Sequence, residues 1–217
     1  MNILERMDAR LPLTSEEHML LASVKALCNA QIAPRAAAYD RSGEFPWENV
    51  RAINELGLNA MFIPDAYGGA QLSFTSYLAC AREISKACAS TGIIWATNFH
   101  AIKPLIEYGS EEQKSRLLPR IAEGGLAALA ITEPSAGSDA TGMRTSFTPD
   151  GDDIIINGAT PVTTNRDVAN HYIVIKKKNN ITTDAKEVVT NNVVKKANVK
   201  TETKIDKKVK ETERKSL

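Results

Sequence analysis

The chain has 217 residues, of which 43% are hydrophobic and 24% are charged, and its formal net charge is +1. This length is enough for one large domain or two small ones with a sizeable core. The three cysteines form no C-x-x-C pair, which argues against a disulfide or zinc framework and favours reduced, buried thiols. The first ten residues lack an apolar leader, and no apolar run approaches a membrane span, so we expect a cytoplasmic protein without membrane contact.

The first half of the chain shows helical periodicity. The sequences TSEE at 14–17 and SEEQ at 110–113 are capping boxes, in which a hydroxyl is followed three residues later by Glu or Gln. Pro34 is expected to stop or kink the first helix, Pro46 to open the second, and Gly92 to separate the third from the fourth. Five helices joined by short polar links are predicted, which together make an α-helical domain.

The period then changes from that of a helix to that of a strand. The apolar run at 126–131 predicts a short buried strand. Residues 144–147 and 154–156 flank a turn with the sequence TPDGDD, which predicts a hairpin. Residues 162–165 and 172–175 are expected to form two more strands. The order indicates the start of an antiparallel β-domain.

Between these strands lies a polar turn at residues 130–142. Pro134 ends the strand ladder and Gly137 permits a tight backbone path. Thr132 and Ser138 are among the hydroxyl side chains, and the turn exposes several backbone N–H groups. Such a loop is suited to cradle a planar heteroaromatic ring and a phosphate.

The end of the chain differs in composition. Residues 176–217 carry 13 Lys or Arg against 6 Asp or Glu, a net charge of +7, and contain no Gly, Pro or aromatic residue. Low hydrophobicity with a large charge excess predicts a disordered tail. A frameshift or gene fragment would produce such a tail, and a functional basic tail is the alternative. Its interspersed acidic residues and lack of aromatic side chains argue against nucleic-acid binding.

The fold class predicted from these observations is α+β: an N-terminal α-helical bundle, a partial antiparallel β-domain and a disordered basic tail. The predicted boundaries are 1–126 for the helical domain, 127–175 for the partial middle β-domain and 176–217 for the tail.

Three segments resemble motifs of the acyl-CoA dehydrogenase flavoproteins. The sequence AITEPSAGSD at 130–139 is similar to the signature loop of that family, and GLNAMFIPDAYGG at 57–69 to the segment between its second and third helices. In the latter, Gly68 and Gly69 are expected to serve the turn. NGATPVTTN at 157–165 resembles a second flavin motif, except that the lysine and tryptophan of the family are replaced by Thr160 and Val162.

The resemblance covers roughly residues 14–175 and implies an FAD site. Ile131 and Thr132 would face the pyrimidine edge of the flavin, Thr164 would lie near flavin N5, and Ser138 would lie near both the pyrophosphate and the substrate. The residues expected to bind the cofactor are Leu129, Ile131, Thr132, Gly137, Ser138, Thr163 and Thr164. Because Val162 replaces tryptophan, the large ring that packs on the flavin in the family is missing here.

The resemblance also implies a reaction: α,β-dehydrogenation of an acyl-CoA thioester, with hydride transfer to flavin N5 and electron-transfer flavoprotein as acceptor. The catalytic glutamate of the family lies in a C-terminal helical domain that has no counterpart here, so no catalytic residue is predicted. We expect a truncated dehydrogenase, in which Glu133 has a structural role, and homo-oligomers in the family at large. The alternative is a catalytically inactive fragment or a non-enzymatic binding protein.

Other chemistries have weaker support. Ser138 beside Asp139 lacks the G-x-S-x-G context of a hydrolase. His18, His100 and His171 have no metal-ligand spacing, and no metal site is expected.

Overall fold

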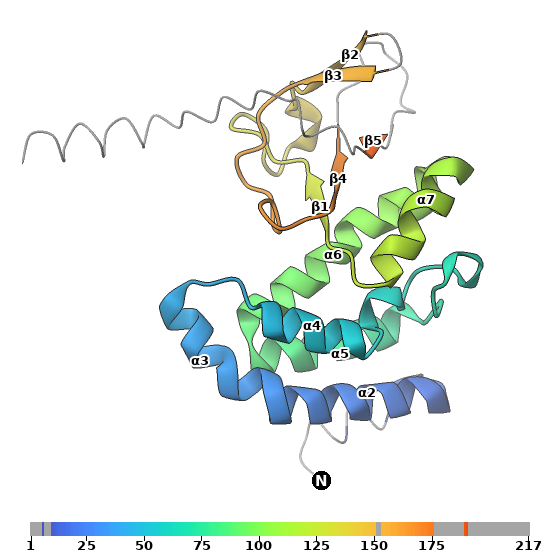
Figure 1. The fold of residues 1–217 in the computed structure, drawn as a ribbon, viewed down its shortest axis with the longest axis vertical. Helices are drawn as coiled ribbons and strands as arrows, with labels where there is room; N and C mark the ends of the chain where they lie inside the picture. Colours follow the sequence, from blue (N-terminus) through green and yellow to red (C-terminus); the bar gives the residue numbers. More distant parts are fainter. Residues whose placement is uncertain (1–5, 7–9, 151–152, 176–188, 191–217) are drawn as a thin grey trace, which may run out of the picture.

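The computed structural model describes residue 6 and residues 10–150, 153–175 and 189–190. Helices occupy one half of the molecule and strands the other, with the long helix α6 between them (Figure 1). This arrangement confirms the predicted α+β class. The predicted tail lies outside the described residues, except for the short strand β5 (Val189–Thr190). β5 pairs with a neighbouring strand of the sheet.

The first helix, α2 (Ser15–Leu27), begins at the predicted capping box, in which Thr14 and Glu17 cap one another. It does not stop before Pro34. A π-helical turn (Cys28–Ile32) carries the chain into α3 (Ala33–Ser42), and the helix axis changes direction there (Figure 1). Pro34 lies in the first turn of α3, where a missing N–H costs little. Of the two predicted outcomes at this proline, the kink is the one observed.

Among the described residues of this half there are four more α-helices: α4 (Trp47–Glu55), α5 (Phe74–Ala87), α6 (Ala89–Tyr108) and α7 (Glu111–Ala122). The predicted break at Gly92 is wrong, because α5 ends at Cys88, whose backbone is extended, and Gly92 lies inside α6. A Cβ atom at Gly92 would overlap Ser85 of α5. The glycine therefore serves the close approach of two helices, which is a tertiary contact that local sequence does not reveal.

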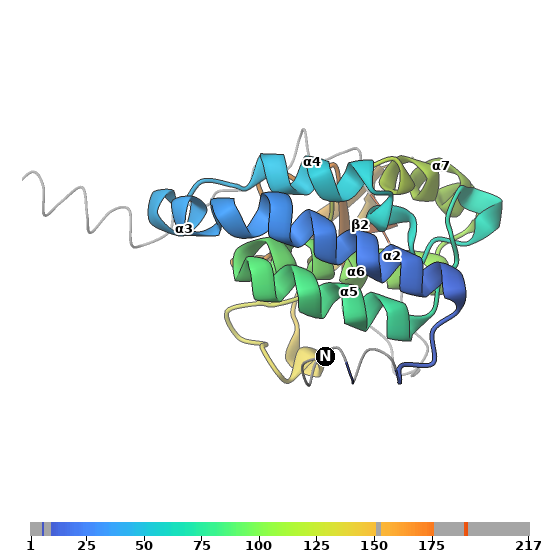
Figure 2. The same cartoon turned by 90° about the horizontal axis from the view of Figure 1, so that it is seen from below.

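The main core lies between the helices, which run side by side in Figure 2. Ala127 and Ile173 of the sheet belong to the same core, so the strands are anchored to the helices through buried side chains. The three cysteines are buried and free, as expected from their spacing. Among the described helices, none has the length and hydropathy that a membrane crossing requires.

The sheet differs from the prediction in one pairing. β1 (Ala127–Ala130) runs parallel to β4 (His171–Val174), with Ala127 opposite His171, and β5 adds to β4 in antiparallel orientation. The predicted hairpin is confirmed as β2 (Ser146–Asp150) and β3 (Asp153–Asn157). The parallel pair arises because the whole hairpin and a long loop intervene between β1 and β4, which allows the crossover that parallel strands need.

Glu17 connects two helices. Its carboxylate accepts hydrogen bonds from the backbone N–H of Thr14 at 3.0 Å and of Ser73, the N-cap of α5, at 2.8 Å. Burial alone would raise its pKa, but the bonds from Ser73, Thr14 and Ser76 outweigh that effect and lower the pKa to about 2, from an ordinary 4.5. The charged form is therefore the one that stabilises the fold.

Replacement of Glu17 by Gln is expected to lower the free energy of unfolding by about 1–2 kcal/mol at pH 7, because neutral acceptors make weaker hydrogen bonds than carboxylates. A group whose pKa is depressed on folding stabilises the protein above its unfolded pKa, and this contribution disappears as the carboxylate is protonated. The difference between wild type and Glu17→Gln should thus shrink between pH 4.5 and about 2. Urea titrations across this range provide the check, and a difference independent of pH would contradict it.

Candidate functional site

The polar turn after β1, residues 130–142, is called the signature loop below. Its first part is closed by two backbone hydrogen bonds between Glu133 and Ala136, of 3.0 and 3.2 Å. Farther along, the Asp139 carboxylate accepts from the backbone N–H of Thr141 at 3.1 Å and opens a short 3₁₀ turn (Ala140–Gly142). The loop therefore has a defined backbone path rather than an open one.

A buried carboxylate holds the loop in place. One oxygen of Glu133 accepts from the backbone N–H of Arg144 at 2.7 Å, and the other accepts from both the backbone N–H, at 2.7 Å, and the hydroxyl of Thr145. Burial by itself would raise the pKa of Glu133, but these bonds and the charge of Arg144 lower it. Because both oxygens are occupied, Glu133 is a structural anchor, as its position in the loop suggested.

The segment at residues 158–170, called the second loop below, meets the signature loop at an isolated bridge. Thr132 and Val162 form an isolated antiparallel bridge. The predicted strand at 162–165 is wrong, since the chain turns directly after this bridge and Asn165 has a φ of 65°. An asparagine tolerates this left-handed backbone better than most side chains do.

Two buried asparagines connect the second loop and the start of β1 to the helical half. Asn165 donates from Nδ2 to the carbonyls of Ile94 in α6, at 3.2 Å, and of Ala127 in β1, at 3.4 Å. Asn98 of α6 accepts from the backbone N–H of Ala127 through its Oδ1. The start of β1 is thus held by an amide on each side. In the sequence, Asn165 is recognisable only as part of a motif. Asn98 could not be recognised, because an asparagine inside an apolar helix carries no local signal of its tertiary partner.

The structure brings part of the predicted site together. Thr132 of the signature loop pairs with Val162, which directly precedes Thr163 and Thr164 in the second loop. Thr132 and Thr163 are half-buried, whereas Thr164 is exposed. Leu129 and Ile131 are half-buried residues at the end of β1 and just after it. Gly137 and Ser138 lie farther along the signature loop, where both are exposed.

The residues at this junction fit one edge and one face of a flavin. The hydroxyl oxygen of Thr163 is buried and has no hydrogen-bond partner among the described residues, although a buried polar atom normally finds one. Val162 is 70% exposed, which is unusual for a valine paired across a bridge. Around Gly137, a Cβ atom would meet nothing within 4 Å. An unpaired hydroxyl, an apolar side chain open to solvent and an unobstructed backbone are what a planar ring with a polar edge and a phosphate require.

Within the described ranges, no group of three or more His, Cys, Asp or Glu side chains could hold a metal ion. The donors near the bridge are hydroxyls and amides, which suit an organic cofactor.

Two family models match this chain. The model described as "Acyl-CoA dehydrogenase, N-terminal domain" matches residues 14–125, and the model described as "Acyl-CoA dehydrogenase, middle domain" matches residues 128–212. The second match runs past residue 175, the predicted end of the middle domain, so that boundary remains a prediction.

Similar proteins cover most of this chain. The "Probable acyl-CoA dehydrogenase YngJ" of Bacillus subtilis is 39% identical over 164 residues, which is 75% of this chain and 43% of that protein. A structure of glutaryl-CoA dehydrogenase from Mycobacterium smegmatis in complex with FADH2 is 29% identical, with a TM-score of 0.69, over 75% of this chain and 42% of that one.

A third likeness is to a structure described as the electron transferring flavoprotein of Acidaminococcus fermentans. It is 33% identical, with a TM-score of 0.70, and covers 75% of this chain and 43% of that one. The chain thus spans less than half the length of each of these relatives.

Proposed function

This chain belongs to the acyl-CoA dehydrogenase family, and we propose that its signature loop and second loop bind FAD in a protein that oxidises acyl-CoA thioesters. The observation that carries the proposal is the bridge between Thr132 and Val162, with the unpartnered hydroxyl of Thr163 next to it. This bridge joins the two segments whose sequences resemble flavin motifs, although Thr132 and Val162 are 30 positions apart in the chain.

Each predicted site residue has a task in this proposal. The hydroxyls of Thr132, Thr163 and Thr164 hydrogen-bond the polar edge of the flavin ring, and the apolar side chains of Leu129, Ile131 and Val162 contact its face. Gly137 and Ser138 are exposed. In the proposal their backbone binds a phosphate, and the Ser138 hydroxyl also contacts the substrate. When bound, FAD supplies the hydride acceptor for α,β-dehydrogenation.

The proton that leaves the α-carbon needs a base, and the described loops restrict which group can serve. Glu133 is the carboxylate of the signature loop nearest the bridge, and three donors already occupy its oxygens. A general base must instead present a free oxygen at hydrogen-bonding distance from the proton. We therefore assign proton removal to a carboxylate other than Glu133, in keeping with the family. Acyl-CoA as substrate and an electron-transfer flavoprotein as acceptor complete the proposed reaction; this acceptor is the protein for which one similar structure is named.

Flavin binding tests the proposal. FAD is titrated into the wild-type chain and into Thr132→Val and Thr163→Val, which remove a hydroxyl without changing shape. Loss of a buried hydrogen bond costs about 1–3 kcal/mol, so each variant should bind FAD roughly five- to a hundredfold more weakly.

Thr148→Val is the matched control, because Thr148 is an exposed residue of β2. Its affinity should equal that of the wild type. A wild-type chain that binds no FAD, or equal affinity in all four proteins, would contradict the proposal. Reduction of the bound FAD by an acyl-CoA distinguishes a dehydrogenase from a protein that only binds flavin.

A further inference from the structure

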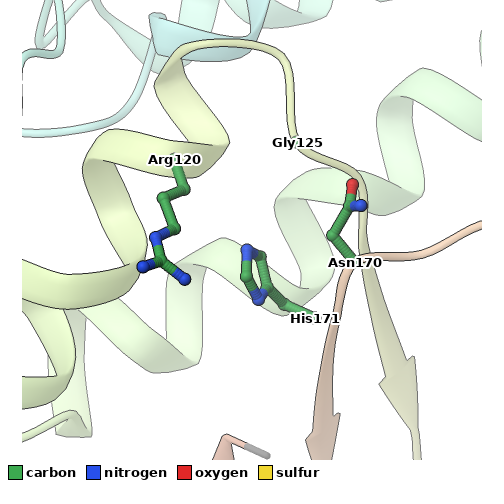
Figure 3. Close-up of a pocket in the computed structure, with 4 residues that line it drawn as sticks. All are labelled: Arg120, Gly125, Asn170 and His171. Atoms are coloured by element: carbon green, nitrogen blue, oxygen red, sulfur yellow. The ribbon is translucent and has the colours of Figure 1, made fainter. Parts of the chain in front are cut away.

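A pocket of about 400 Å³ lies where α7 ends and the parallel strands begin. Its lining comes from three places: Arg120 on α7, Gly125 in the link to β1, and Asn170 with His171 at the start of β4. Figure 3 shows the Arg120 guanidinium directed toward the imidazole of His171, with the Asn170 side chain on the other side. The pocket is within the size range of small-molecule sites, roughly 300–1,000 Å³.

The side chains that line the pocket present hydrogen-bond donors and no carboxylate. His171 is only 6% exposed, yet within the described part of the chain its ring has no hydrogen-bond partner. Arg120 is exposed and likewise forms no ion pair with a described residue. The Asn170 oxygen accepts from the backbone N–H of Leu126 at 3.0 Å, so its amide N–H₂ is the group left for a ligand.

We propose that this pocket binds the phosphate group of a small organic phosphate. A guanidinium presents a planar fork of donors that matches the oxygens of a phosphate, and the imidazole and amide add donors from the opposite side. A free inorganic anion would leave much of the 400 Å³ empty, which is why we favour a phosphate carried by a small organic molecule. This inference does not depend on flavin binding.

The electrostatics agree with an anionic ligand. Burial lowers the pKa of His171 most, and the charges of Arg120 and Arg116, both on α7, lower it further. The described groups around the ring are thus cationic or neutral, since its neighbour Asn170 and its partner in the sheet, Ala127, carry no charge. A bound dianion would oppose the two arginines and raise the pKa of His171. By linkage, affinity for the anion should therefore increase as the pH falls and His171 becomes protonated.

The experiment uses the full 217-residue chain and isothermal titration with methyl phosphate, inorganic phosphate and acetate at constant ionic strength. We expect methyl phosphate to bind at least as tightly as inorganic phosphate, and acetate to bind more weakly than either. Because hydrogen bonds to charged groups are strong, Arg120→Gln should weaken methyl phosphate binding about tenfold or more. Arg51→Gln, which removes an exposed cation from α4, should leave it unchanged.

The role of His171 is measured without a mutation. The ring protons of His171 are followed by NMR through a pH titration with and without sulfate, whose charge stays constant over this range. The pKa of His171 should rise when sulfate is present. An unchanged pKa, equal weakening by Arg51→Gln and Arg120→Gln, or tighter binding of acetate than of methyl phosphate would each overturn the proposal.

Discussion

Replacement of Glu133 by Ala is expected to lower the free energy of unfolding by about 3–5 kcal/mol, because three donors lose their acceptor and each orphaned group costs about 1–3 kcal/mol when buried. The donors are the backbone N–H groups of Arg144 and Thr145 and the hydroxyl of Thr145, which is a buried residue. Chemical denaturation at neutral pH measures the loss. FAD affinity should fall with it, since the same carboxylate holds the signature loop.

The pH dependence of the free energy of unfolding separates the contribution of the Glu133 charge from that of its side-chain shape. Its pKa is lowered on folding, so the stabilisation is complete above the ordinary value of 4.5 and is lost as the pH falls through the lower pKa of the folded state. Glu133→Gln keeps one acceptor oxygen and should lose less stability than Glu133→Ala. Equal stability of Glu133→Ala and wild type at neutral pH would show that the anchor is unnecessary.

Replacement of Gly69 by Ala is the second large effect, and we expect it to cost about 3 kcal/mol, at the upper end of the usual range for overpacking. A Cβ atom at this position would overlap the carbonyl group and side chain of Ile63. Backbone hydrogen bonds hold the two segments together, including Gly69 N–H to Pro64 at 3.2 Å and Gln71 N–H to Ile63 at 3.1 Å. The clash therefore cannot be relieved by a side-chain rotation.

Gly137→Ala is the matched control, because its Cβ atom would meet nothing within 4 Å and its backbone is not in the left-handed region. Its melting temperature should stay close to that of the wild type. A Gly69→Ala variant as stable as Gly137→Ala would refute this explanation of the double glycine, in which Gly68 supplies a φ of 79° and Gly69 the close approach.

The local features of this fold could be predicted from the sequence. The capping boxes at Thr14 and Ser110 form as expected, because their partners lie three residues away. The hairpin forms because a tight turn joins strands that are adjacent in the chain, and Gly57 adopts a φ of 73° just beyond the end of α4. Each of these depends on neighbours in the chain, where residue types alone determine the favoured geometry.

Features that depend on residues far away in the chain could not be predicted from the sequence. Gly92 looks like a helix break until Ser85 is seen to lie against it. The parallel pairing of β1 and β4 joins strands that are far apart in the chain, and the second loop is fixed by the bonds of Asn165 to α6 and β1. For the site, the sequence motifs identified the two loops. The Thr163 hydroxyl without a partner among the described residues, and the hydrogen bond between Asn98 and Ala127, could be recognised only in the folded structure.

Hydrogen exchange tests most directly whether these two loops hold the flavin together. Amide exchange of the wild-type chain is measured by mass spectrometry with and without saturating FAD. We predict slower exchange in both the 130–138 and 162–165 segments when FAD is present, with α3 unchanged as the internal reference. Protection of only one loop, or of neither at saturating FAD, would contradict the account.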